Sequence, residues 1–297
     1  MKSVVIEEGV IRINDAAFRG CSRLTSIEIP EEVTSIGKTV FYGCSDLKSI
    51  DIPGSVMSIG HYAFADCSSL TSINIPDGVT SIESGLFKGC NNLKSVNIPN
   101  NVTSIGDNTF QGCSSLTSIE IPEGVTSIGN GAFYGCSSLT SIEIPNTVTI
   151  IGSSAFYGCN SLTRIEIPES VTSIRNRTFG GCSSLTDIEI SDNVTNIGDY
   201  AFRECNKLKN VVIGDSVTSI GNQAFFGCSS FESFVIPNSV INIGYEAFLG
   251  CRSLTRIEIP NSVTTIGRDA FQKCNSLSTV LIGERSNKYR KSFISKL

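Results

Sequence analysis

The sequence predicts a repeat solenoid, rich in β-structure, in which short parallel strands are joined by tight turns. Two regularities predict this fold class. All twelve cysteines, from Cys21 to Cys274, are spaced by 23 residues, and a phenylalanine stands three positions before each of them. Eight apolar positions recur in each repeat, which assigns most of the 40% hydrophobic content to one repeating core. A conventional globular domain with a single closed core is therefore excluded.

Each repeat contains a first strand with the pattern L-T-S-I-E-I, as in residues 116–121. Apolar and polar positions alternate there, which predicts a half-buried strand that pairs in parallel with the strand of the next repeat. Proline follows the strand in nine of twelve repeats and ends it, because proline lacks a backbone donor. Ser191, Gly214 and Gly283 replace it in the other three.

The pattern V-T-S-I follows and predicts a second, shorter extended segment. Glycine comes after it in nine repeats, where we expect it to permit a turn with positive φ. The next segment, A-F-x-G-C, fits one helical or 3₁₀ turn that directs the phenylalanine into the interior, and its glycine ends that turn. The position after the phenylalanine is often aromatic, and we expect these side chains to pack over the edge of the core.

The motifs LTSIEIP, VTSIG and AFYGC resemble the BspA-like (treponemal-type) leucine-rich repeats of bacterial and protozoan surface proteins, and they cover residues 4–283. The resemblance implies a curved, right-handed solenoid with its strands on the concave face. It also implies a role in adhesion and host contact, at the cell surface or outside the cell. It identifies no ligand, because the motif residues are structural.

We predict one solenoid of twelve repeats over residues 1–283 and a basic tail over residues 284–297. The tail carries five Lys or Arg against one Glu, and Tyr289, Phe293 and Leu297 have helical spacing, which predicts a short capping helix. The chain opens with MKSVVIEEGV, without the apolar core of a signal peptide, and contains no apolar run long enough for a membrane helix.

Composition and spacing argue against catalysis, cofactors, metals and nucleic acid. The chain has one histidine and a net charge of −5, which disfavours a general affinity for phosphate backbones. Cysteines 23 residues apart match no zinc motif, so we expect buried, reduced thiols that fill apolar space, although neighbouring repeats are close enough for disulfides. His61 precedes Tyr62 at a turn. We interpret it as an exposed turn residue rather than as the base of a nucleophile pair with Cys67.

The column between the two strand isoleucines predicts the binding surface. Four consecutive glutamates, Glu120, Glu143, Glu166 and Glu189, occupy it. Because like charges on adjacent strands repel, folding does not require this acidic ribbon, which would suit a cationic or amide-rich partner. The alternative is that duplicated repeats keep glutamate as a solvated face. Calcium is a weaker alternative, since it needs about six to eight oxygens.

The rest of this column and its neighbours change character along the chain. Arg164 and Asp187 vary the charge, flanking Thr and Ser columns are expected to add hydroxyl donors, and Val212 and Val235 form a small apolar patch. Phe231 and Phe234 fall on core positions, where we expect a repacked interior. The candidate partner-binding residues are Glu120, Glu143, Arg164, Glu166, Asp187, Glu189, Val212 and Val235.

These features predict a non-enzymatic binding or adhesion scaffold, without cofactor or metal, that holds a protein or glycan partner on the concave strand face around residues 117–235. The alternative is a structural protein whose matching ends stack into filaments.

Overall fold

The computed structural model describes residues 1–282, which belong to two compact units. Unit 1 is Met1–Cys159, and unit 2 begins at Asn160. In both units each 23-residue repeat forms one circuit of the chain, called a rung below. Gly283, the basic tail and the capping helix predicted for it lie outside the described residues. The single solenoid over residues 1–283, its curvature and its handedness stay predictions.

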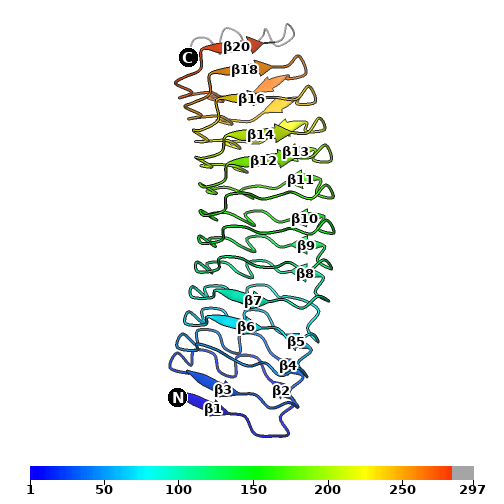
Figure 1. Cartoon of the computed structure of the whole chain (residues 1–297), viewed down its shortest axis with the longest axis vertical. Helices are drawn as coiled ribbons and strands as arrows, with labels where there is room; N and C mark the ends of the chain where they lie inside the picture. The colour runs from blue at the N-terminus through cyan, green and yellow to red at the C-terminus, as the bar shows by residue number, and fades with distance from the viewer. Residues whose placement is uncertain (283–297) are drawn as a thin grey trace. The chain divides into compact units, whose positions relative to one another are not determined.

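The first strands of the rungs run parallel to one another within each unit (Figure 1). Residues paired between neighbouring strands are 23 apart, as for Asn74 and Asn97, which confirms the predicted register. The first strands of unit 1 are β1 (Ser3–Val5), β3 (Ser26–Glu28), β6 (Ser72–Asn74) and β7 (Ser95–Asn97). Those of unit 2 are β12 (Asp187–Ile190), β14 (Asn210–Ile213), β16 (Ser233–Val235), β18 (Arg256–Ile259) and β20 (Thr279–Ile282).

The second strands, from V-T-S-I, are two residues long and also pair in parallel. Unit 1 has a sheet of β2, β4 and β5 and a sheet of β8, β9 and β10, whereas all five second strands of unit 2 form one sheet. In unit 1 they are β2 (Arg12–Ile13), β4 (Ser35–Ile36), β5 (Ser58–Ile59), β8 (Ser104–Ile105), β9 (Ser127–Ile128) and β10 (Ile150–Ile151). In unit 2 they are β11 (Ser173–Ile174), β13 (Asn196–Ile197), β15 (Ser219–Ile220), β17 (Asn242–Ile243) and β19 (Thr265–Ile266).

The first-strand sheets are less continuous than the sequence predicts. Residues 49–51, 118–120 and 141–143 of unit 1 and 164–166 of unit 2 keep the alternating burial of a strand but are not part of a sheet. The side chains predicted to face outward still do so, because burial alternates in the same phase. The predicted binding face therefore consists, within each unit, of paired strands and of extended segments in line with them.

The glycine after V-T-S-I has a different purpose from the one expected. At Gly129 φ is not positive, and a Cβ atom there would lie 2.6 Å from the backbone nitrogen of Asp107 on the preceding rung. Glycine is required for close approach of two rungs, so the prediction of positive φ is wrong at this position. Glu83 replaces this glycine in one rung of unit 1, and Ile82 there keeps only an isolated bridge to Ile105.

The A-F-x-G-C segments form tight turns, and no helix occurs within residues 1–282. Phe133 is flanked by Gly131 and Gly135, whose φ angles are 59° and 71°. A right-handed 3₁₀ or α turn needs negative φ throughout, so left-handed residues on both sides explain why the expected helical turn is not found. Unlike Gly129, the second recurring glycine, Gly135, which the sequence predicts to end the turn, has positive φ.

The phenylalanine and cysteine columns form the centre of each core. Neighbouring Phe rings stack with centroids 5.2–5.9 Å apart in unit 1 and 5.1–5.4 Å apart in unit 2. The cysteine thiols do more than fill space. Cys136 Sγ donates to the carbonyl oxygen of Phe110 on the preceding rung at 3.2 Å, and Cys228 Sγ donates to that of Phe202 at 3.1 Å. The thiol thus provides a buried hydrogen bond between rungs.

Asp and Asn side chains tie the turns of neighbouring rungs together. In unit 1, Asp107 Oδ1 accepts from the backbone N–H of Asn130 at 2.6 Å, and Asn130 Oδ1 accepts from that of Ser153 at 2.9 Å. In unit 2, Asp199 Oδ1 accepts from the N–H of Asn222 at 2.7 Å. These carboxylate and amide groups belong to the scaffold, so they are not candidates for ligand binding.

Candidate functional site

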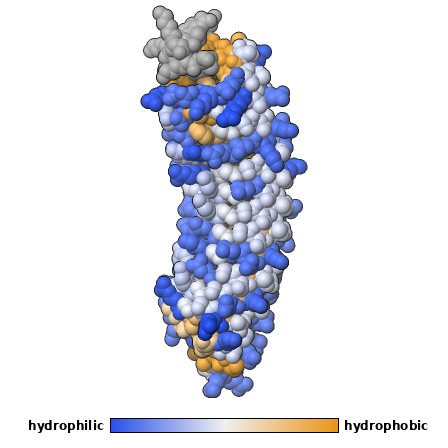
Figure 2. Space-filling view, turned by 90° about the vertical axis from the view of Figure 1, so that its left-hand side faces the viewer, coloured by the Kyte–Doolittle hydropathy of each residue, from blue (hydrophilic) through white to orange (hydrophobic). Residues whose placement is uncertain are grey.

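The candidate site lies on the strand face, which we define as the surface formed by the exposed side chains of the first strands and of the extended segments in line with them. In the view of Figure 2, hydrophilic and neutral residues dominate the surface, and hydrophobic residues gather in small areas near the upper and lower ends. Among the described residues, the outward column of the first strands carries four exposed large hydrophobic residues, Val5, Val212, Val235 and Leu281.

The four glutamates of the predicted ribbon are exposed, as expected. Glu120 and Glu143 belong to unit 1, and Glu166 and Glu189 belong to unit 2. Two of the four carboxylates thus belong to each unit. A continuous ladder across all four therefore stays a prediction.

In unit 2 the ribbon is partly neutralised by its own cations. Arg164 Nη2 lies 2.5 Å from Glu166 Oε1, and Arg256 Nη2 lies 4.0 Å from Glu258 Oε2. Both pairs are largely exposed, so each adds little stability and a partner can compete for either group. Within residues 1–282 no side chain pairs with Glu189. Glu189 is therefore available to an incoming cation.

Asp187 is held as a carboxylate by its neighbours. Thr186 Oγ1 donates to Asp187 Oδ2 at 2.6 Å, and Asn210 Nδ2 donates to Oδ1 from the adjacent strand β14. These two hydrogen bonds, helped by the positive charges of Arg164 and Lys209, hold the pKa of Asp187 below its usual value. Asp187 thus presents a fixed negative charge beside Glu189.

Val212 and Val235 are two of the three exposed apolar residues in the outward column of unit 2, the third being Leu281 of β20. The exposed fractions of the two valines are 58% and 76%, the latter the highest of any large hydrophobic residue described. Val212 pairs with Glu189 across β12 and β14, and Val235 pairs with Glu258 across β16 and β18. Each valine thus has a carboxylate as its neighbour on one side.

The core beneath these valines is repacked, as the sequence predicts. Phe231 and Phe234 are buried, and the ring of Phe234 meets those of Phe225 and Phe248 edge-on, with centroids 5.0 and 4.8 Å apart. Strands β14 and β16 are not paired with each other. The pairing of the first strands is thus interrupted at the rung that carries the two phenylalanines.

A shallow groove of about 450 Å³ brings the predicted residues of unit 2 together on its strand face. Arg164, Glu166, Asp187, Glu189 and Val212 line it, and Val235 lies on the following rung. The structure therefore gathers the unit 2 part of the predicted site. Glu120 and Glu143 lie in unit 1 and are not part of this groove.

Threonines of the column that flanks the glutamates were expected to offer hydroxyl donors to a partner, but their hydroxyls bond to the backbone. Thr140 Oγ1 donates to the carbonyl oxygen of Thr117 at 3.2 Å, and Thr71 Oγ1 donates to that of Lys48 at 3.3 Å. A hydroxyl has a single hydrogen, so these groups cannot also donate to a partner. The prediction of additional donors is wrong for these threonines.

A second groove, of about 640 Å³, lies on the strand face of unit 1, and Glu120 is the one predicted site residue in its lining. Asp51, Asn74 and Asn97 line it with Glu120, together with serines of the flanking column. Asn97 Nδ2 donates to Asn74 Oδ1 at 2.7 Å. The asparagines are visible in the sequence at the same column as the glutamates, but only their pairing in register reveals an ordered amide pair.

The groups that could support catalysis or metal binding are engaged or buried. His61 Nδ1 lies 3.3 Å from Glu83 Oε2, and Cys67 is fully buried. Burial raises the pKa of the Cys113 thiol to about 12 and that of Cys44 to about 11, so these thiols are not nucleophiles at neutral pH. Among residues 1–282, no three His, Cys, Asp or Glu side chains gather in a metal-binding arrangement, and no helix could span a bilayer.

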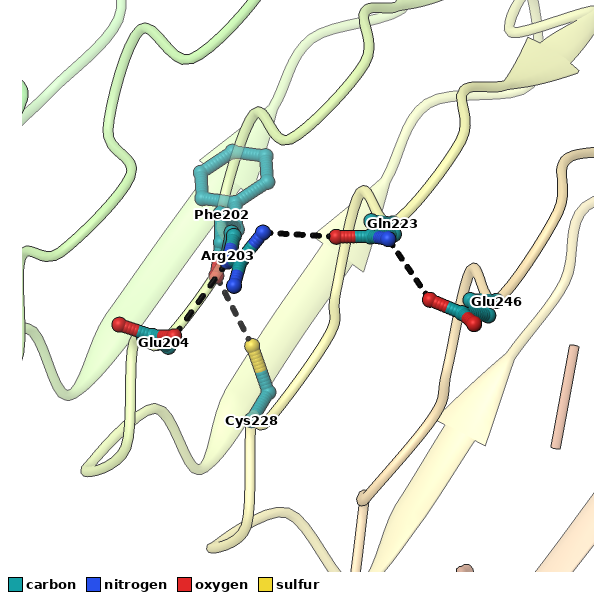
Figure 3. Close-up of polar contacts among 6 residues, drawn as sticks. All are labelled: Phe202, Arg203, Glu204, Gln223, Cys228 and Glu246. Carbon is teal, nitrogen blue, oxygen red and sulfur yellow. Dashed lines mark hydrogen bonds and ion pairs between the residues drawn. The ribbon is translucent and has the colours of Figure 1, made fainter. Parts of the chain in front are cut away.

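The turns of unit 2 carry a second polar cluster (Figure 3). Arg203 Nη1 donates to Gln223 Oε1 at 2.8 Å, and Gln223 Nε2 donates to Glu246 Oε2 at 2.6 Å, which links three rungs. The Arg203 guanidinium also covers the ring of Phe226 at 4.6 Å. Tyr134 in unit 1 stacks on Tyr157. The aromatic residues after the core phenylalanine thus contact one another or a guanidinium along the turns, and their packing over the edge of the core stays a prediction.

Comparison with known proteins agrees with this architecture. The family model for the BspA type leucine rich repeat region, in six copies, matches residues 1–117, 103–232 and 218–296. The chain belongs to the BspA-type leucine-rich repeat family. No curated protein matches it.

Solved structures of other leucine-rich repeat proteins are similar. A leucine-rich repeat protein from Bacteroides ovatus is 33% identical, with a TM-score of 0.80 over 97% of this chain and 80% of that one. A leucine rich cell surface protein from Faecalibacterium prausnitzii is 34% identical, with a TM-score of 0.65 over 97% and 89%. The leucine-rich repeat protein of T. pallidum is 32% identical, with a TM-score of 0.50 over 54% and 77%. A leucine-rich repeat scaffold of this kind is typical of protein-binding modules.

Proposed function

We propose that this leucine-rich repeat protein is a non-enzymatic binding scaffold, acting in adhesion, whose unit 2 strand face holds a protein partner. The observation that carries the proposal is the pair Val212 and Val235, 58% and 76% exposed beside carboxylates. The fold does not require an apolar residue at either position, since glutamate occupies the same column in other rungs. The 34% identity to a leucine rich cell surface protein supports a place at the cell surface, where adhesion occurs.

The apolar part of the face suits a side-chain anchor. Protein interfaces concentrate their binding energy in a few apolar contacts that are surrounded by polar groups. Val212 and Val235 provide the apolar centre, and Asp187, Glu189 and Glu258 provide the polar surroundings. The scaffold holds all of them on strands, so a partner would find the surface already in place.

The charged part of the face indicates which partner sequence fits. Asp187 keeps its charge because hydrogen bonds lower its pKa, and Glu189 lacks a cation of its own within residues 1–282. A complementary segment therefore carries Lys or Arg next to an aliphatic or aromatic residue. Such charges accelerate association and fix orientation, while the apolar contact slows dissociation.

Selection from a displayed library of random peptides tests the proposal and requires no identified partner. The wild-type chain should select peptides in which Lys or Arg adjoins an apolar residue. The Val212→Ser and Val235→Ser double variant should bind them at least about tenfold more weakly, since burying each valine contributes about 1.5 kcal/mol or more. Selection of peptides without charge preference, or unchanged affinity of the variant, would contradict the proposal.

Ile241→Ser is the matched control. Ile241 is 43% exposed and lies in the same unit just before β17, on the second-strand side rather than on the strand face. Its loss should leave peptide affinity unchanged while removing a similar exposed apolar side chain. An equal loss of affinity in this control would indicate a general effect of surface polarity rather than a site.

The first rung supports a second candidate function, end-to-end self-association. Val5 and Ile11 are 66% and 65% exposed, and Phe18 and Cys21 are partly exposed although their equivalents on the other described rungs are buried. Stacking another copy on this rung would bury Phe18 and Cys21, whereas Val5 and Ile11 lie in outward-facing columns beside Glu28 and Thr34 of the next rung. Sedimentation over a wide concentration range should then show growing species that the Cys21→Asp variant, which places a charge in the contact, abolishes. A single species at all concentrations would exclude this candidate.

A further inference from the structure

The groove in unit 1 differs in chemistry from the proposed protein site and lies apart from it in the chain. Four successive rungs line it through Asp51, Asn74, Asn97 and Glu120. The flanking column of the same strands consists of exposed serines, including Ser72 and Ser95. Strands β6 and β7, which carry both asparagines, pair in register and can be followed in Figure 1. The groove is thus an ordered array of amide, hydroxyl and carboxylate groups.

The amide pair is orientated. Because Asn97 Nδ2 donates to Asn74 Oδ1 at 2.7 Å, the two side chains are aligned along the rungs. Asn74 keeps its whole NH₂ group for donation, and Asn97 keeps its Oδ1 for acceptance. Asp51 and Glu120 add acceptors on either side. A ligand that presents both a hydrogen-bond donor and an acceptor to each rung satisfies this pattern, and a hydroxyl group is both.

The lining excludes two ligand classes. None of the groove residues is Lys, Arg or His, so an anionic ligand would meet two carboxylates without a compensating cation. Most of its apolar members are buried, as Ile73 and Val96 are at 5% and 9% exposed, and only Ile52 is half-buried, so an apolar anchor residue of a protein partner would have little apolar surface to contact. A neutral, strongly polar ligand fits best.

Spacing separates the two neutral candidates, an extended peptide and a linear glycan. Neighbouring rungs are about 4.8 Å apart, whereas equivalent groups on one side of an extended peptide recur every 6.6 to 6.8 Å, about two residues of strand. A peptide laid across the rungs would therefore lose register after one or two of them. One sugar residue of an extended linear glycan is close to one rung in length, so each rung can meet one sugar and its hydroxyls.

We propose that the unit 1 groove binds a linear neutral glycan across the rungs, with one sugar residue opposite each rung from Asp51 to Glu120. Asn74 donates to, and Asn97 accepts from, the hydroxyls of the two central sugars. Asp51 and Glu120 accept hydrogen bonds from the sugars at the two ends. The site is separate from the protein-binding face of unit 2 and does not depend on it.

An oligosaccharide array tests this inference directly. The probes are linear neutral hexose and N-acetylhexosamine oligosaccharides of graded length, with uronic acid and sulfated oligosaccharides of the same lengths. The wild-type chain should bind neutral probes and no acidic ones. Affinity, measured by calorimetry, should rise with length to about four sugars and then level off, because about four rungs of 4.8 Å line the groove.

The decisive variant is Asn74→Val with Asn97→Val. Valine already occupies this column at Val212 and Val235, so the substitution is compatible with the fold. It should weaken glycan binding at least about tenfold, since each lost hydrogen bond costs about 1 kcal/mol or more. Asn92→Ser is the matched control, because Asn92 is an exposed turn residue and other rungs carry serine there, and it should bind as the wild type does.

Three results would overturn the inference. They are the absence of binding to every neutral probe, a preference for acidic probes, and equal affinity of the double valine variant. Recognition of peptides by this groove would appear as loss of peptide binding in the same variant and would also contradict it. The Val212→Ser and Val235→Ser variant should retain full glycan binding, so failure of the protein-site proposal and failure of this one are distinguishable.

Discussion

Replacing Gly129 with alanine should destabilise unit 1 because of close contact between rungs. The added Cβ would lie 2.6 Å from the nitrogen of Asp107, 2.6 Å from its Oδ1 and 2.6 Å from the carbonyl carbon of Gly106. Two of these atoms are backbone, so relief requires the rungs to separate. Separation weakens the hydrogen bond from Gly129 N to Ile105 O, now 2.8 Å, and that from Asn130 N to Asp107 Oδ1, now 2.6 Å. Overpacking of this kind costs about 1–3 kcal/mol.

Two other glycines of unit 1 provide the controls. Gly54 has no atom within 4 Å of a built Cβ and no positive φ, so Gly54→Ala should be neutral or stabilising by about 0.4–1 kcal/mol. Gly135 has φ of +71° but its nearest contacts are at 3.9 Å, so Gly135→Ala carries only left-handed strain of about 1–2 kcal/mol. The three variants therefore separate close approach from backbone conformation.

Urea unfolding followed by circular dichroism measures these effects, since the chain has no tryptophan to report by fluorescence. Gly54→Ala should unfold at or above the wild-type midpoint, and Gly135→Ala and Gly129→Ala should unfold below it. The sheet signal of Gly129→Ala should also weaken, because rung pairing is disturbed. If Gly129→Ala unfolded at the same urea concentration as Gly54→Ala, the close-approach argument would be refuted.

Three other predictions concern the core and the acidic face. Phe133→Ala should cost about 3–5 kcal/mol in urea unfolding, because this fully buried ring stacks on both neighbours. Burial raises the pKa of Cys113 from 9.0 to about 12, so this thiol ionises in the unfolded chain before it ionises in the folded one. The free energy of unfolding should therefore fall as the pH rises above about 9, which the urea midpoint measured against pH would show. Glu189→Gln should leave folding unchanged and slow association with a selected cationic peptide in stopped-flow measurements, with a difference that shrinks at high salt. An effect of Glu189→Gln that is independent of salt would contradict steering.

The repeating core could be predicted from the sequence because burial is encoded by position. A period of 23 places each phenylalanine and cysteine at the same depth, and the structure buries Phe133 and Cys136 completely. The purpose of the glycine at 129 could not be predicted, because period alone does not distinguish positive φ from close approach. The absence of a helical turn could not be predicted either. The residues on both sides of Phe133 are left-handed, and the only sign of this in the sequence is that glycine is frequent there.

The site was predictable as a column of residues and not as a set of contacts. Exposure of Val212 and Val235 follows from strand alternation, which the sequence displays. Pairing between Arg164 and Glu166 and the hydrogen bonds that hold Asp187 depend on side-chain conformations, which no pattern encodes. The groove in unit 1 was missed because its asparagines carry no charge, and charge was the signal that drew attention to this column.

Hydrogen exchange measured by mass spectrometry, on the wild-type chain with and without a selected cationic peptide, tests the central claim most directly. The claim is that the unit 2 strand face holds the partner. Binding should slow exchange in residues 187–190, 210–213 and 233–235, which are β12, β14 and β16. Strands β14 and β16 should show the larger change, since they are not paired with each other in the free chain. Protection confined to the turns or to the second strands, with these three strands unchanged, would contradict the account.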